Sequence, residues 1–138
     1  MNYARIGLAF LGATVAYFAC GFAMFAALPG MKREFMKYPN VFRSEEGMMK
    51  CMPYGMVSIL ISIAVVAVLY AKMYPAEGGL VSGVYLGALM GIFAVCVFVI
   101  HNYVYLNIGV TLALYEGISY FIQWVIVGAA IGLIYKPA

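Results

Sequence analysis

The sequence predicts an all-α membrane protein, an antiparallel bundle of four transmembrane helices. Hydrophobic residues make up 67% of the 138 residues and charged residues only 9%, whereas charged residues form roughly a quarter of a soluble domain. Four apolar segments are each long enough to cross the hydrocarbon core, which takes about 20 helical residues. The chain length suits one transmembrane domain over residues 1–138.

The first span is expected at residues 6–28, before Pro29 and Gly30. This apolar run of about 23 residues is longer than the h-region of a signal peptide, so we interpret it as a retained span. A polar first loop is expected at residues 29–50.

The second span is expected at residues 51–71. Ser44 is a candidate N-cap, with Glu45 and Glu46 in the first turn, where carboxylates oppose the positive end of the helix dipole. Pro53 predicts either a kink or a delayed helix start, because proline lacks an amide donor.

The third span is expected at residues 80–100 and the fourth at residues 112–135, after a short loop over 72–79. The start of the fourth span has two interpretations. Residues 102–115 form either an interfacial turn with a short helix, or the beginning of a long, tilted fourth helix. We favour the long helix, which brings Glu116 into the low-dielectric region.

The distribution of basic residues predicts the orientation. The first loop carries five bases, whereas the side with both termini carries Arg5, Lys72 and Lys136. By the positive-inside rule the first loop is cytoplasmic. The net charge of +3 is too small to indicate a nucleic-acid partner.

Glycines at spacing four predict close helix packing. Their lack of side chains lets a neighbouring helix approach closely, within the bundle or between copies of the chain. The third span carries a stripe of four and the fourth span a pair: Gly79, Gly83, Gly87, Gly91, Gly128 and Gly132.

Polar residues on the fourth span form the candidate functional site. Glu116 is followed at helical spacing by Ser119, Tyr120 and Gln123. An acidic residue within a span is costly and indicates a proton or cation site. The alternative is a carboxyl near the headgroups that pairs with His101 or a first-loop base. His101, Asn102 and Asn107 are expected at the same depth and complete the candidate site.

Other motifs give weaker evidence for a functional site. A single histidine cannot supply both axial ligands of a haem, nor a complete ligand shell for zinc. Met48, Met52 and Met56 share one helical face near Cys51, which permits a soft copper site but equally fits flexible packing. We find no phosphate loop, catalytic triad or metal-ligand cluster, and expect no cofactor.

The chain resembles small bacterial four-helix membrane families of unknown function. The resemblance rests on Leu28-Pro29-Gly30, on the polar first loop and on the stretch 120–132. It implies a multi-pass protein of the bacterial cytoplasmic membrane and carries no activity. The chain lacks the first-span acidic residue of small multidrug exporters and the paired cysteines of disulfide-generating membrane enzymes.

Three function classes remain. The first is a non-catalytic accessory subunit or homo-oligomeric scaffold, with the lipid bilayer and either further copies or a larger membrane complex as partners. The second is a small transporter or channel with a protonatable Glu116. The third is an enzyme acting on a lipid-like substrate, although nothing in the sequence assigns a catalytic residue.

Overall fold

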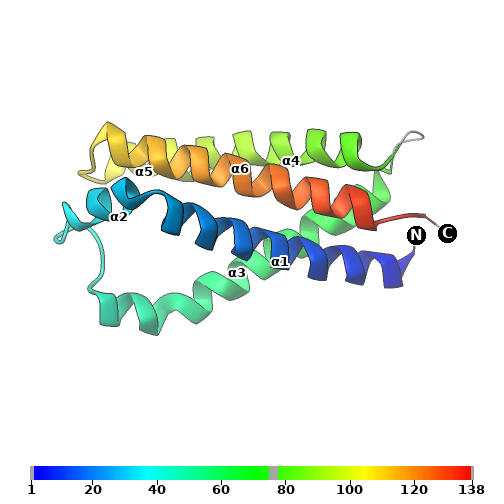
Figure 1. The fold of residues 1–138 in the computed structure, drawn as a ribbon, viewed down its shortest axis with the longest axis horizontal. Coiled ribbons are helices and arrows are strands. Elements are labelled where there is room, and N and C mark those ends of the chain that lie inside the picture. Colours follow the sequence, from blue (N-terminus) through cyan, green and yellow to red (C-terminus); the bar gives the residue numbers. More distant parts are fainter. Residues whose placement is uncertain (1, 75–77, 138) are drawn as a thin grey trace.

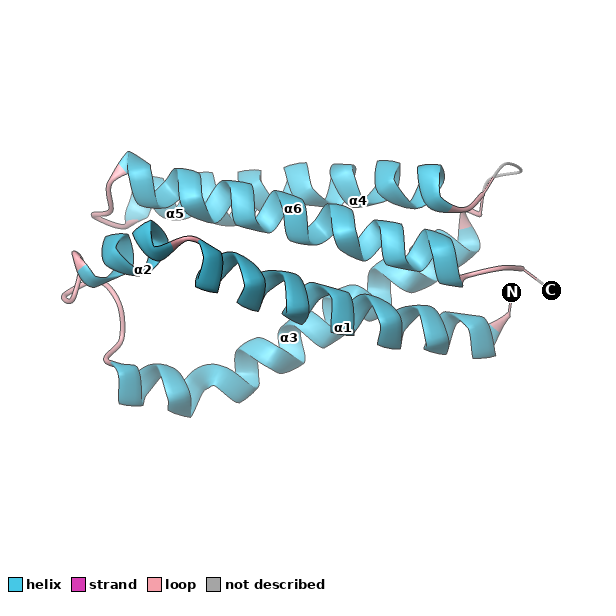
Figure 2. Cartoon of the chain, viewed as in Figure 1, coloured by secondary structure: helices cyan, strands magenta, loops and turns pink. Residues whose placement is uncertain are grey.

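The protein is a bundle of long helices. The computed structural model describes residues 2–74 and 78–137, which contain helices and no strand (Figures 1 and 2). Within these ranges four helical segments are long and apolar enough to cross a membrane: Tyr3–Ala27, Glu45–Lys72, Leu80–Tyr105 and Val110–Ile134. A 25-residue helix is about 37 Å long, which exceeds the roughly 30 Å of hydrocarbon. The predicted all-α, multi-pass membrane class is confirmed.

Helix α1 (Tyr3–Ala27) is followed directly by a short helix, α2 (Pro29–Met36). The side-chain oxygen of Asn2 caps α1 by accepting a hydrogen bond from the backbone N–H of Arg5 (3.2 Å). Leu28 leaves the helical conformation, and Pro29 then starts α2, where its missing N–H costs no hydrogen bond. The segment expected as a polar loop therefore contains a helix.

Helix α3 (Glu45–Lys72) begins within the predicted first loop. Ser44 is its N-cap, as predicted, and accepts a hydrogen bond from the N–H of Gly47 at 3.3 Å. Pro53 lies inside the helix and does not delay its start. No residue of α3 before Ile63 is buried, and this half of the helix diverges from its neighbours in Figure 1.

The third membrane segment joins α4 (Leu80–Ala94), a π-helical segment η1 (Val95–Ile100) and α5 (His101–Tyr105). Gly79 precedes α4 with a φ of +107°, a conformation that glycine adopts without strain. The Tyr70 hydroxyl accepts a hydrogen bond from the N–H of Gly79 and donates one to its carbonyl, both at 2.9 Å. The turn between α3 and α4 is thereby held to α3. The expected loop here also includes residues 75–77, which lie outside the described residues.

Helix α6 (Val110–Ile134) takes in residues 110–115 of the segment with two interpretations, whereas residues 102–105 belong to α5 and a turn over residues 106–109 separates the two helices. The N–H of Gly109 donates a hydrogen bond to the Tyr38 hydroxyl (2.9 Å). The end of the first loop is thereby attached to the beginning of α6.

Helix α6 is the centre of the bundle. It packs along α4 on one side and α1 on another, while α3 contacts both α1 and α6 less extensively. The buried core lies in the half of the bundle near the termini, and both termini lie at that end (Figure 1). It is formed by Ala9, Ala13, Tyr17, Ile63, Val66, Ala67, Tyr70, Ala71, Val127, Ile131 and Tyr135. The first-loop half is packed less densely.

Candidate functional site

A partly open cavity of about 220 Å³, lined by both polar and apolar side chains, lies between α1, α2 and α6, in the first-loop half of the bundle. All three helices contribute side chains to its wall. The lining residues are Tyr17, Gly21, Met24, Phe25, Met31, Phe35, Glu116, Ser119, Tyr120 and Gln123.

Helix α6 supplies the polar wall. Glu116, Ser119, Tyr120 and Gln123 all line the cavity, because residues three, four and seven positions apart share a helix face. The structure thus brings together four of the predicted candidate-site residues. Glu116 lies six residues after the start of α6, about 9 Å along the helix axis.

Helix α1 supplies the opposite wall, through a second set of residues at helical spacing. Tyr17, Gly21 and Met24 lie at intervals of four and three. A Cβ added to Gly21 would collide with the side-chain amide of Gln123. The glycine therefore makes room for the Gln123 side chain to enter the cavity.

Helix α2 covers the first-loop end of the cavity. Its Met31 and Phe35 side chains face inward, and the Ser119 hydroxyl lies 3.9 Å from the Met31 sulfur as a weak hydrogen-bond donor. Gly30 packs against Tyr115. A Cβ added to Gly30 would lie 2.6 Å from the hydroxyl oxygen of Tyr115. This close approach sets α2 directly against α6.

Glu116 is the only carboxylate or base that lines the cavity. It is half-buried and makes no ion pair or side-chain hydrogen bond with any residue in 2–74 or 78–137. The ion pairs of this part of the chain join Lys37 to Glu34 and Lys50 to Glu46, outside the cavity. The cavity therefore presents one uncompensated acidic group.

The proposed contact between His101 and Glu116 is wrong. His101 is exposed on α5, and its ring lies against Tyr105 with centroids 4.7 Å apart. Asn102 and Asn107 are also exposed and do not line the cavity. These three residues were expected at the depth of Glu116, but an equal depth does not place side chains on facing helix surfaces.

The glycine stripe faces α6 within the chain. A Cβ added to Gly87 would lie 2.9 Å from the Cα of Val125, and one added to Gly128 would lie 2.6 Å from the Cα of Gly87. Gly83 approaches Gly128 and Gly132, while Gly91 approaches the backbone of Phe121. Gly79 lies in the turn before α4, and its carbonyl meets Gly132. The stripe is therefore not available as a surface for a second copy.

The methionine face of α3 is exposed. Met48, Met52 and Met56 lie on the diverging half of that helix and Cys51 is half-buried there. Among the described residues, no group of three or more His, Cys, Asp or Glu side chains is placed to hold a metal ion. Nothing in this arrangement supports the copper interpretation over flexible packing.

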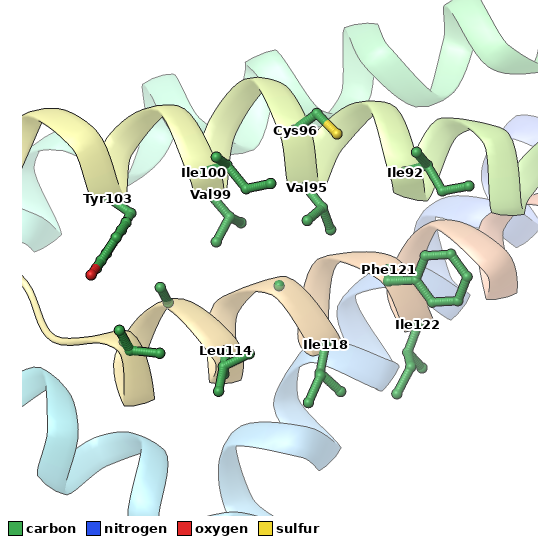
Figure 3. Close-up of a pocket in the computed structure, with 13 residues that line it drawn as sticks. Ile92, Val95, Cys96, Val99, Ile100, Tyr103, Leu114, Ile118, Phe121 and Ile122 are labelled. Atoms are coloured by element: carbon green, nitrogen blue, oxygen red, sulfur yellow. The ribbon is translucent and has the colours of Figure 1, made fainter.

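A second, larger cavity of about 640 Å³ is an apolar groove on another face of α6 (Figure 3). Val95 and Val99 of η1 point across it toward α6 in Figure 3. Tyr103 also lines it, but neither His101 nor Glu116 does. The groove carries no charged side chain and has no feature of a catalytic site.

Sequence reasoning missed the α1 and α2 walls of the Glu116 cavity. The isolated Gly21, with Tyr17 and Met24 at helical spacing, is a signal that marks one face of α1. Pro29 at the first helical position is a signal for α2. Neither signal indicates that these residues line the same cavity as Glu116.

Compared with protein-family models, with curated proteins and with solved structures, the chain has no match.

Proposed function

We propose that the chain is a small transporter or channel in which Glu116 binds a proton or another small cation. The observation that carries this proposal is the unpaired Glu116 carboxylate in a cavity within a membrane-spanning helix. A charged side chain at this depth costs stability, and such residues are characteristic of ion pathways and proton relays. A purely structural carboxylate is expected to have a partner.

The polarity of the cavity supports the same proposal. Gln123, Ser119, Tyr17 and Tyr120 bring an amide and three hydroxyl groups to its wall, and a space with several such polar partners can hold water. A hydrated carboxylate can exchange a proton or a cation with the aqueous side. The cavity lies in the first-loop half of the bundle with α2 over its end, so the proposed route to water passes α2.

The bacterial cytoplasmic membrane and a cytoplasmic first loop belong to this proposal. The first-loop end carries Lys32, Arg33, Lys37, Arg43 and Lys50. The end with the termini carries Arg5, Lys72 and Lys136. The excess of positive charge favours cytoplasmic placement of the first loop, and the Glu116 cavity then lies in the cytoplasmic half of the bundle.

Reconstitution into liposomes tests the proposal. Purified protein is incorporated with a trapped pH-sensitive dye, and a potassium diffusion potential drives cation or proton entry. We expect Glu116→Gln, which keeps the shape and removes the charge, to lower the flux at least about tenfold, as for loss of an essential proton-transfer group.

Glu45→Gln is the matched control, because it makes the same chemical change at an exposed residue outside the cavity. It should carry the wild-type flux. Absence of any flux from the wild-type protein, or equal flux from Glu116→Gln, would contradict the proposal.

A second candidate function is an accessory subunit or homo-oligomeric scaffold. It is favoured by the first half of α3, where no residue before Ile63 is buried and Met48, Met52 and Val57 are exposed. A partner helix would pack there. Cross-linking from a cysteine introduced at Val57 should then trap a dimer or a complex in native membranes, and a monomer alone would argue against this role.

An enzyme acting on a lipid-like substrate has the least support. Its expected signature is a lipid-sized groove beside His101 and Glu116. Neither residue is among those that line the apolar groove.

A further inference from the structure

The side chains that line the Glu116 cavity restrict the class of ligand that it can bind. Among its lining residues Glu116 is the single carboxylate and none is a lysine, arginine or histidine, so the complementary ligand is positively charged. The wall therefore has no base to satisfy the carboxylate from within. An anionic or neutral ligand would leave this carboxylate uncompensated.

Aromatic rings dominate the rest of the wall. Tyr17 and Phe25 come from α1, Phe35 from α2 and Tyr120 from α6. The face of an aromatic ring attracts a cation, and cages of such rings recognise alkylated ammonium groups. Four rings from three helices line the same cavity as one carboxylate, a composition that suits an ammonium group with apolar substituents.

The orientation of these rings is supported from outside the cavity. Phe98 of η1 stacks on Tyr120 with centroids 6.5 Å apart, and Phe42 packs against Phe35 at 4.9 Å. Trp124 meets Tyr17 edge-on at 6.1 Å. Three of the four rings therefore have an aromatic neighbour that restrains them.

The cavity volume sets the size of the ligand. The cavity measures about 220 Å³, which is room for more than one water molecule. This is more than a bare inorganic ion fills and less than the 300–1,000 Å³ or so of drug-sized pockets. Hard metal cations also prefer a shell of six or more oxygens, whereas much of this wall is aromatic carbon and the thioethers of Met24 and Met31.

We infer that the ligand of this cavity is a small organic cation, a protonated amine or quaternary ammonium with short apolar substituents. Glu116 balances its charge, while Tyr17, Phe35 and Tyr120 contact its alkyl groups. Gln123 and Ser119 accept hydrogen bonds from an ammonium that carries protons. This inference rests on the proposed cation-transport function and specifies its substrate class.

Ligand titration of the purified protein in detergent tests the inference. Trp124 is the only tryptophan and lies against Tyr17 of the cavity wall, so its fluorescence reports occupancy. The probes are tetramethylammonium, methylammonium and sodium, with tert-butanol as a neutral molecule of similar shape. We expect saturable changes with the two organic cations, together with a rise in melting temperature from preferential binding to the folded state.

Two substitutions separate charge from aromatic contact. Glu116→Gln should weaken tetramethylammonium binding at least about tenfold, because it removes the only countercharge. Phe35→Leu should weaken it about two- to fivefold, the scale of one cation–π contact, and should affect sodium less. Phe93→Leu is the matched control, because Phe93 is exposed on α4 away from the cavity, and it should bind as the wild type does.

The outcomes distinguish this inference from the function on which it rests. Wild-type flux of protons or sodium, with no saturable response to either organic cation, overturns the organic ligand and leaves cation transport standing. Equal responses to tert-butanol and tetramethylammonium, or unchanged binding in a folded Phe35→Leu variant, also overturn it. If neither flux nor binding is found, both proposals fail together.

Discussion

The two faces of α6 show opposite ways of packing helices in a membrane. On the α4 face, glycines bring the backbones together, so that a Cβ on Gly87 would lie 2.5 Å from the carbonyl oxygen of Trp124. On the α1 and α2 face, the side chains of Tyr17, Gln123 and Phe35 line the 220 Å³ cavity between the helices. Helix pairs in lipid associate through van der Waals contact, which small residues maximise.

The difference assigns separate roles to the two faces. The α4 face is a continuous backbone contact that holds α6 in place, with no room for a side chain along it. The α1 and α2 face has less backbone contact with α6, and the cavity on this face contains the unpaired Glu116 carboxylate. A binding site in a small bundle needs both features, because a charged cavity is tolerated only where other contacts keep the fold stable.

The largest predicted effect comes from filling the glycine contact. Gly87→Leu would force the α4 and α6 backbones apart, because its Cβ meets main-chain atoms that cannot move independently. We expect a loss of about 3 kcal/mol in the free energy of unfolding, at the upper end for overpacked sites. Unfolding in mixed detergent micelles measures this loss.

Gly7→Leu is the control for that substitution, because no atom lies within 4 Å of a Cβ at Gly7. It should leave the stability unchanged. Equal stability of both variants would show that the α4–α6 contact does not hold the bundle together.

Single methyl groups sharpen the comparison between the two faces. Gly87→Ala places a Cβ against backbone, whereas Gly21→Ala places one against the flexible end of the Gln123 side chain, which can move. We expect Gly87→Ala to cost about 1–2 kcal/mol, as overpacking does, and Gly21→Ala to stay within about 0.5 kcal/mol. The same unfolding assay compares them.

The order of these two variants should be reversed for function: Gly21→Ala should affect cation flux more than Gly87→Ala does. Gly21→Ala displaces Gln123 within the cavity and should reduce cation flux while the bundle stays folded. Equal destabilisation by the two alanines would mean that the α1 and α6 helices are as tightly held as α4 and α6.

The smallest predicted effect is on stability at Glu116. Glu116→Gln should raise the free energy of unfolding by about 1 kcal/mol, because a charge away from the bilayer centre costs less than the roughly 3 kcal/mol of a central one. Glu45→Gln should change it little, since Glu45 is exposed. Destabilisation by Glu116→Gln would instead identify the carboxylate as a structural group and remove the basis for transport.

Local sequence patterns predicted which residues share a helix face, but not which neighbouring helix that face contacts. The spacing of Glu116, Ser119, Tyr120 and Gln123 placed them on one face of the fourth span, and all four line the cavity. The same local reasoning could not pair His101 with the correct surface. Depth along a helix follows from counting residues, but the direction of a side chain around the bundle depends on which helices are neighbours.

By itself, the sequence determined four helices apolar and long enough to span a membrane, the N-cap at Ser44 and the presence of an acidic residue within the fourth of these helices. These follow from hydrophobicity, helix length and hydrogen bonding within one segment, and need no information about neighbours. Only the tertiary structure decided that Tyr17 and Gly21 of α1 meet Glu116, that α2 covers the cavity and that α3 diverges before Ile63. In lipid almost every helix face is apolar, so hydrophobicity does not select partners and the fit of side chains between helices does.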